Sequence, residues 1–149
     1  MASNFSSYLF FLVVIAILTC LTEAQVRIKS KKTGLVFQYN GTNVEVAEPN
    51  DSEGQKWILE CSQKGHFIIN SNKQGLAMDI KKGCKIGQSV MVYDKHSRQN
   101  QQFFINSDAT IGTACDANLI LLVKDRNVEV APRDNYFDFD IHFEIEPIE

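Results

Sequence analysis

Four side chains between residues 79 and 101 form a set that can bind a sugar: Asp79, Tyr93, Asn100 and Gln101. A sugar presents vicinal hydroxyls and one apolar C–H face, so its site needs a carboxylate acceptor, an amide and an aromatic platform. Asp79 supplies the carboxylate, Tyr93 the ring, and Asn100 or Gln101 the amide. Each residue also has a structural interpretation, as a turn aspartate, a half-buried strand tyrosine or an Asn-Gln brace. Because all of them fall within one short stretch, we expect a binding site there.

The residues around this set have the pattern of short strands. Apolar and polar residues alternate in Val26–Lys29, in Val44–Val46 and most clearly in residues 137–145. Alternation with a period of two is typical of half-buried strands. Turn residues rich in Gly, Pro, Asn and Asp separate these runs at short intervals. The mature chain is therefore predicted to be a single all-β domain, either a sandwich or a barrel.

Internal repeats favour the barrel. Asn43–Ala47 recurs letter for letter as Asn127–Ala131, and Ser89–Tyr93 has the same pattern between them. After each of these segments comes a strand with one aromatic anchor, namely Trp57, Phe103 and Phe143. Three units of roughly forty residues are too few for a propeller, but they suit a closed barrel, which has no exposed sheet edges.

The middle unit carries a specific motif, and Gln55-Lys56-Trp57 repeats part of it. Its elements are Gly75-Leu76-x-x-Asp79, then Gly87-x-x-Val90-x-x-Tyr93, then Asn100-Gln101-x-Phe103. This pattern resembles the repeat of the ricin B-type lectins. The resemblance implies a β-trefoil, in which three pseudo-repeats form a closed barrel with a hairpin cap.

The same resemblance implies a galactose or N-acetylgalactosamine type of ligand and a non-catalytic role. Asp79, Tyr93 and Asn100 match its binding positions, while Gln101 would orient Asp79 and Phe103 would lie in the core. The chain also departs from the pattern. Ala77 and Lys95 stand where the family has a cysteine pair, so that bridge is absent.

The first and third units lack the binding set. The first has Gln38 in place of the aspartate and Ala47 in place of the platform. The third has Leu122 and Ala131 at these positions, and Ile141 where a glutamine is expected. We therefore expect one shallow site, in the middle unit, which would bind glycans weakly and would gain avidity from an oligomer or a multivalent surface.

Residues 1–24 are predicted to be a secretory signal peptide, with the domain occupying residues 25–149. Tyr8–Leu21 is apolar but too short to span a bilayer comfortably, and small residues precede the expected cleavage after Ala24. The alternative is an uncleaved N-terminal anchor. Without Glu23 the chain has 15 basic and 17 acidic residues, a net charge of −2 that gives no reason to expect nucleic acid.

Secretion would allow the cysteines to form a disulfide and two sequons to be glycosylated. Cys61, Cys84 and Cys115 allow one disulfide in three possible pairings, and the spare thiol would be buried and inert or would pair with a second chain. Asn40 and Asn50 head the two sequons, which predict glycosylation on exposed loops.

Other chemistry is not expected. His66, His96 and His142 have no metal-ligand spacing, and no nucleophile arrangement or phosphate loop is present, so we expect no enzyme, metal or cofactor. Two small lysine groups are interpreted as solvated loops, although they could touch a sulfated glycan or an anionic surface: Lys29, Lys31 and Lys32, and Lys81, Lys82 and Lys85.

Two alternatives stay open. The first is a trefoil that binds a protein through its loops, as a protease inhibitor or a cytokine-like ligand does. Pro132–Tyr136 or the Cys84 loop would then carry the function. The second is a degenerate trefoil with a structural role, which the loss of two sites out of three would explain.

Overall fold

The computed structural model describes residues 24–133 and 138–149. The predicted signal peptide lies outside these residues, apart from Ala24, so the structure does not test it. Among the described residues the helical segments are two three-residue 3-10 turns, and none could span a membrane.

The described chain is all-β, as predicted. Two 3-10 turns, η1 (Glu53–Gln55) and η2 (Gln99–Gln101), each precede a strand that opens with an aromatic residue. The strands are β1 (Gln25–Ser30), β2 (Val36–Tyr39), β3 (Val44–Ala47), β4 (Trp57–Ser62), β5 (Gly65–Asn70), β6 (Leu76–Ile80), β7 (Val90–Asp94), β8 (Phe103–Ile105), β9 (Ile111–Thr113), β10 (Leu119–Lys124), β11 (Asn127–Pro132) and β12 (Phe143–Pro147).

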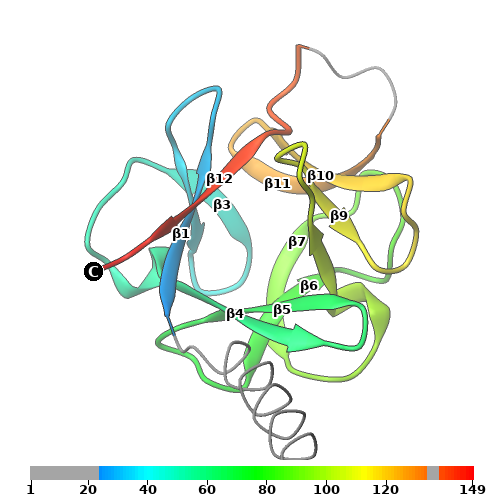
Figure 1. Ribbon diagram of the computed structural model, residues 1–149, viewed down its shortest axis with the longest axis horizontal. Coiled ribbons are helices and arrows are strands. Elements are labelled where there is room, and N and C mark those ends of the chain that lie inside the picture. The colour runs from blue at the N-terminus through cyan, green and yellow to red at the C-terminus, as the bar shows by residue number, and fades with distance from the viewer. Residues whose placement is uncertain (1–23, 134–137) are drawn as a thin grey trace, which may run out of the picture.

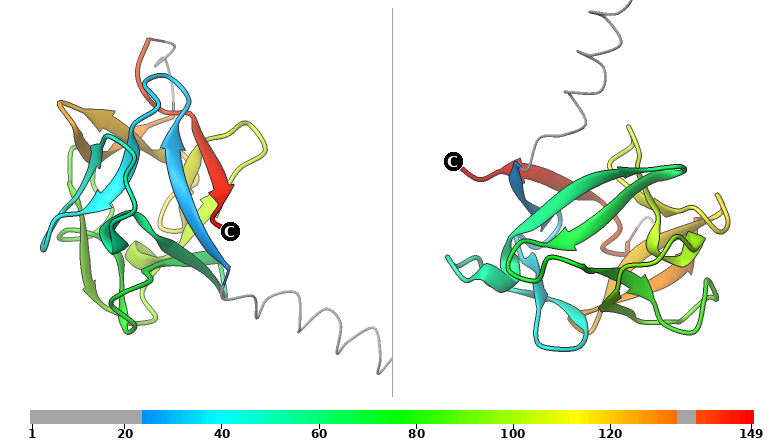
Figure 2. Two further views of the ribbon diagram at one scale, coloured as in Figure 1. Left: turned by 90° about the vertical axis from the view of Figure 1, so that its left-hand side faces the viewer. Right: turned by 90° about the horizontal axis from the view of Figure 1, so that it is seen from below.

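Six of the strands form a barrel. In order around it, β12 pairs with β1, β1 with β4, β4 with β5, β5 with β8, and β8 with β9, all antiparallel. The ring closes where the amide of Phe143 in β12 donates to the carbonyl of Ala109, just before β9, at 2.8 Å. Figure 2 shows the first and last strands of the domain, β1 (blue) and β12 (red), lying side by side.

The other six strands form three hairpins, β2–β3, β6–β7 and β10–β11, which make a cap. Equivalent valines join them in a cycle: the amide of Val46 donates to Arg126 O, that of Val130 to Gln88 O, and that of Val92 to Thr42 O. Figure 1 shows the resulting three units about one centre. This is the predicted β-trefoil.

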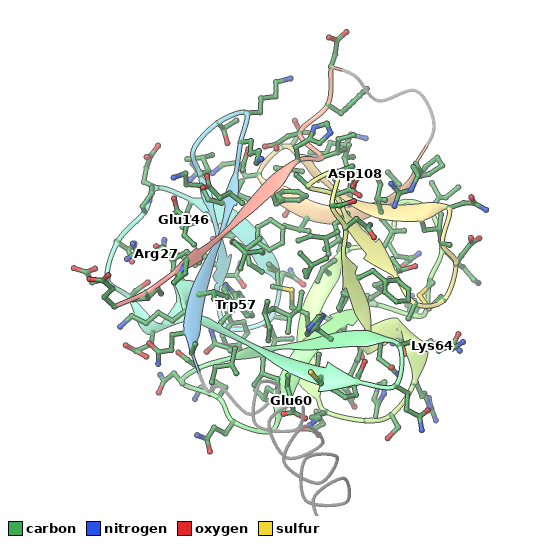
Figure 3. The ribbon with its side chains drawn as sticks, viewed as in Figure 1. Arg27, Trp57, Glu60, Lys64, Asp108 and Glu146 are labelled. Carbon is green, nitrogen blue, oxygen red and sulfur yellow. A yellow bond between two sulfur atoms is a disulfide. The ribbon has the colours of Figure 1, made fainter. Side chains whose placement is uncertain are left out.

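The three aromatic anchors belong to one core cluster. Trp57 and Phe103 are fully buried and Phe143 is nearly so. Trp57 lies within the ring of strands, and its Nε1 donates to Phe37 O at 3.1 Å (Figure 3). Phe37 also packs edge-to-face on Phe143, with the ring centroids 5.0 Å apart. These contacts join the first and third units through the core.

The last predicted strand is shorter than the alternation of residues 137–145 suggested. Phe137 lies outside the described residues, and regular pairing begins only at Phe143. Asp140 is buried, and its Oδ1 accepts the Ser30 hydroxyl at 2.7 Å while its carbonyl accepts the Val123 amide at 2.8 Å. These tertiary bonds divert the chain before β12.

The structure selects one of the three cysteine pairings. Cys84, in the β6–β7 turn, bonds to Cys115, in the loop after β9, with 6.0 Å between their Cα atoms. The prediction of a spare, buried thiol is wrong, because Cys61 is exposed and no cysteine in the described part of the chain is free. The bridge ties the middle unit to the third.

The backbone of Gly65, at the start of β5, lies close to that of Phe103 in β8, and this contact generates a stability prediction. A Cβ at Gly65 would lie 2.2 Å from Phe103 O, whereas Gly75 has nearly the same φ (+92° against +90°) but open space around it. We expect Gly75→Ala to lower the free energy of unfolding by roughly 1–2 kcal/mol. Gly65→Ala should cost about 1–3 kcal/mol more, because β5 must move from β8.

Urea denaturation of the two variants checks this difference. Equal losses in the two variants would mean that the contact between Gly65 and β8 does not constrain barrel closure.

Candidate functional site

The outer face of the β6–β7 hairpin carries two of the four predicted site residues, Asp79 and Tyr93, while Asn100 and Gln101 lie in η2. Asp79 pairs with Met91, and Ala77 pairs with Tyr93, so these four side chains lie on one face. The opposite face, with Met78, packs into the main core. Tyr93 is 52% exposed, and its cross-strand neighbour is the small side chain of Ala77.

Asp79 is a buried carboxylate, 5% exposed, that accepts hydrogen bonds from three side chains. Its Oδ1 accepts Asn100 Nδ2 at 3.0 Å, and its Oδ2 accepts Gln101 Nε2 at 2.9 Å and His96 Nε2 at 3.1 Å. A carboxylate offers about four acceptor positions. Within the described residues, one acceptor position on Oδ1 therefore has no partner.

Gln101 acts as a brace, as the sequence suggested. Besides Asp79 it donates to Asp94 O at 2.9 Å, and its Oε1 accepts the amide of His96 at 2.7 Å. The residue is fully buried at the end of η2, directly before β8. It joins both strands of the hairpin to the loop that follows them, so Asp79 is held in place from the β8 side.

The first unit repeats this brace without a carboxylate. Gln55 Nε2 donates to Gln38 Oε1 at 2.9 Å and to Glu48 O at 2.8 Å, and Gln55 Oε1 accepts the Asn50 amide at 2.7 Å. Gly54 takes the place of Asn100, and a Cβ there would lie 2.8 Å from Tyr39 O. The first unit therefore has neither the acid nor space for the amide.

The third unit replaces the polar brace by apolar packing. Leu122 occupies the position of Asp79 and Ile141 that of Gln101, and both are buried in one cluster with Ile120 and Ala131. The register of β10 with β11 confirms the sequence alignment of the three units. Among the three equivalent hairpins, only β6–β7 has a carboxylate at this position.

His96 belongs to the site, although the sequence interpretation set it aside as a scattered histidine. Its Nδ1 accepts the amide of Arg98 at 3.2 Å, so its Nε2 carries the proton that is donated to Asp79. His96 lies in an irregular loop between β7 and η2, where no periodicity predicts which way a side chain points. The one sequence feature that could have pointed to His96 is its position five residues before Gln101, whose side chain accepts the His96 amide.

Asn100 has a narrower role than the sequence suggested. Both protons of its Nδ2 are used, one toward Asp79 and one toward Ile80 O at 3.4 Å. Its Oδ1 accepts no bond from the described residues. The Asn100 side chain therefore presents an acceptor rather than a donor, as the partner-free position on Asp79 Oδ1 also does within the described residues.

Both predicted glycosylation residues are exposed. Asn40 lies in the β2–β3 turn, with its Oδ1 accepting the amides of Thr42 and Asn43. Asn43 bridges to Met91, so this turn is adjacent to the β6–β7 hairpin although it is distant in sequence. Asn50 lies before η1, with its carbonyl bonded to Arg27.

Comparisons with known proteins show the fold. No family model matches the sequence, and no curated protein is significantly similar to it. Among solved structures, a mosquitocidal holotoxin superposes with a TM-score of 0.76 and 20% identity, covering 87% of this chain. This chain covers only 18% of the holotoxin chain.

Two lectins match over nearly their whole length. The ricin B-like lectin of Macrolepiota procera, solved with lactose, has a TM-score of 0.68 and 11% identity, covering 83% of this chain and 95% of the lectin. The C-half of an earthworm R-type lectin, solved with GalNAc, has a TM-score of 0.64 and 15% identity, covering 84% and 99%. The fold is therefore the β-trefoil of the ricin B-type lectins.

The three units fill the same position with a carboxylate and an amide, with two amides, or with two apolar side chains. This difference predicts that the effects of substitutions at Asp79 and Gln101 on the free energy of unfolding are strongly coupled. We expect Gln101→Ile to lower the free energy of unfolding by about 1–3 kcal/mol, because a buried carboxylate loses a donor. The double variant Asp79→Leu/Gln101→Ile copies the third unit and should cost less than the sum of its single variants. Urea denaturation of all three variants gives the coupling free energy.

The first unit supplies the control for that cycle. Gln38→Leu/Gln55→Ile removes a hydrogen bond between neutral groups, so its coupling should be smaller. Strictly additive costs at Asp79 and Gln101 would show that the brace contributes nothing to holding the carboxylate.

Proposed function

We propose that this protein is a non-catalytic lectin whose carbohydrate site is the outer face of the β6–β7 hairpin. Asp79 and Asn100 would bind ligand hydroxyls, Tyr93 would stack on the sugar, and Gln101 would position Asp79. The observation that carries this proposal is the buried Asp79 carboxylate, held by three donors beside an exposed aromatic ring.

The available atoms favour a ligand with two neighbouring hydroxyls. One acceptor position on Asp79 Oδ1 and the free Asn100 Oδ1 belong to side chains already joined by a 3.0 Å hydrogen bond. Adjacent hydroxyls of a pyranose can donate to both. We propose a galactose or N-acetylgalactosamine type of ligand, which is supported by the lactose and GalNAc complexes of proteins with this fold.

The mode of action follows from having a single site. The hairpin faces of the other units lack the carboxylate, so one chain would bind one glycan, and an exposed site of this kind binds weakly. We propose that the partners are glycoproteins or glycolipids and that an oligomer or a multivalent surface supplies the avidity. This function requires no cofactor.

The cellular context is part of the proposal. A signal peptide over residues 1–24 would direct the chain out of the cell, where the Cys84–Cys115 disulfide is stable. The exposure of Asn40 and Asn50 is compatible with glycosylation in the same pathway.

The first experiment is binding of the purified protein to immobilised glycans. Wild type should bind terminal galactosides, and Asp79→Ala should abolish binding, because the ligand loses its charged acceptor. Gln38→Ala, the equivalent change in the first unit, should leave binding intact. Circular dichroism would check that each variant is folded.

The opposite result also has a clear meaning. If wild type bound none of the glycans, the lectin proposal would fail and loop-mediated protein binding would become the better explanation.

Tyr93 gives a test that does not disturb the core. Because its side chain is half exposed, Tyr93→Ala should change stability little, yet it removes the platform for the sugar. We expect affinity to fall roughly fivefold, or about 1 kcal/mol, from the lost apolar contact. Tyr93→Phe keeps the ring and should bind nearly as wild type. Calorimetric titration measures both, and equal affinities for Tyr93→Ala and wild type would exclude stacking on this ring.

A further inference from the structure

The two lysine groups of the sequence differ in the structure. In the first group, Lys29 forms an ion pair with Glu146, and Lys32 Nζ donates to Asp138 O. In the second group, Lys81, Lys82 and Lys85 are all exposed, and none has an acidic partner within the described part of the chain. Three lysines without an ion pair in the described part of the chain therefore share one short loop.

This loop begins at the proposed sugar site. Lys81 follows Asp79 by two residues, and its amide continues the hairpin ladder by donating to Ser89 O at 3.0 Å. Two residues along a strand span about 7 Å and return to the same face. Lys81 therefore lies beside Asp79 on the site face, and Tyr93 lies on the other side of Asp79.

The charges on the two sides of the site are unequal. On the Tyr93 side, Lys95 forms an ion pair with Glu60 of β4 (labelled in Figure 3) and lies 4.8 Å from the centre of the Phe67 ring. On the Lys81 side, two acids lie nearby, and neither forms an ion pair with Lys81, Lys82 or Lys85 among the described residues. Glu129, which bridges to Ser89, has its carboxylate 4.0 Å from Lys124. Asp116, beside Cys115, accepts the amide of Asn118.

The loop is also held in place before any ligand arrives. The amide of Gly83 donates to Ile80 O at 3.1 Å, and that of Gly87 donates to Val130 O at 2.7 Å in the neighbouring hairpin. Cys84 is bonded to Cys115. A loop fixed at its start, middle and end loses little conformational entropy when it binds, which favours even weak charge contacts.

We propose that residues 81–85 form an anion subsite of the sugar site, so that the preferred ligand is an acidic galactoside carrying a sulfate or a carboxylate. The anionic substituent would lie against Lys81, on the side of the sugar away from Tyr93. This inference rests on the proposed lectin function and adds the class of sugar that the site selects.

The test compares neutral and anionic ligands of one scaffold. Binding of the purified protein would be measured calorimetrically for lactose, for lactose sulfated singly at different galactose hydroxyls, and for sialylated lactose. At low salt we expect at least one anionic ligand to bind about two- to fivefold tighter than lactose, the range for an exposed ion pair. The advantage should disappear near about 1 M salt. The sulfated and sialylated arms distinguish a sulfate from a carboxylate.

Matched single substitutions locate the effect. Lys81→Gln should bring the affinity ratio of anionic ligand to lactose close to one. Lys73→Gln removes the same charge from an exposed turn between β5 and β6, and it should leave the ratio unchanged. If no anionic ligand bound better than lactose, or if both substitutions lowered the ratio equally, the anion subsite would be wrong.

Failure of the lectin proposal gives a different result. In that case lactose would not bind, and Asp79→Ala would change nothing for any ligand. Binding of sulfated lactose that survives Asp79→Ala would show a basic loop acting without a sugar site, which overturns the inference as well.

Discussion

A carboxylate buried on the face of a hairpin has to be hydrogen-bonded, and in this protein that requirement organises the middle unit. Asp79 is satisfied by side chains that come from the loop after β7 and from η2. Gln101 in addition bonds Asp94 O and the His96 amide, so the same residue closes the loop and fixes the acid. The cap hairpin, the loop and the start of β8 are thereby joined as one body.

The three units show three solutions to one packing problem. At the junction of hairpin and barrel, the middle unit uses an aspartate that is hydrogen-bonded to a glutamine, the first unit a neutral pair of glutamines, and the third leucine and isoleucine. All three fill the same position, so the barrel does not require the acid. A buried charge is costly unless it is well paired, so the carboxylate of the middle unit is not explained by packing alone, and this supports the proposed ligand site.

The groups on the two sides of Asp79 differ in chemistry. The atoms left open to a ligand are acceptors, on Asp79 and Asn100, and the exposed Tyr93 ring lies on one side of them. On the other side lie Lys81, Lys82 and Lys85, which have no acidic partner among the described residues. This arrangement is the basis for the proposal that the ligand donates hydroxyl protons to Asp79 and Asn100 and carries a negative charge near Lys81.

The sequence alone determined the all-β class, the three units, the aromatic anchors and the residues that replace Asp79 in the other units, because these follow from local periodicity and repetition. It also placed Asp79, Tyr93, Asn100 and Gln101 in one unit. Only the tertiary structure decided that Cys84 pairs with Cys115, that β12 begins at Phe143, and that His96 joins Asp79. These depend on where irregular loops meet other elements. Such contacts produce no periodic pattern in the sequence, because they are bonds between segments that are distant in sequence.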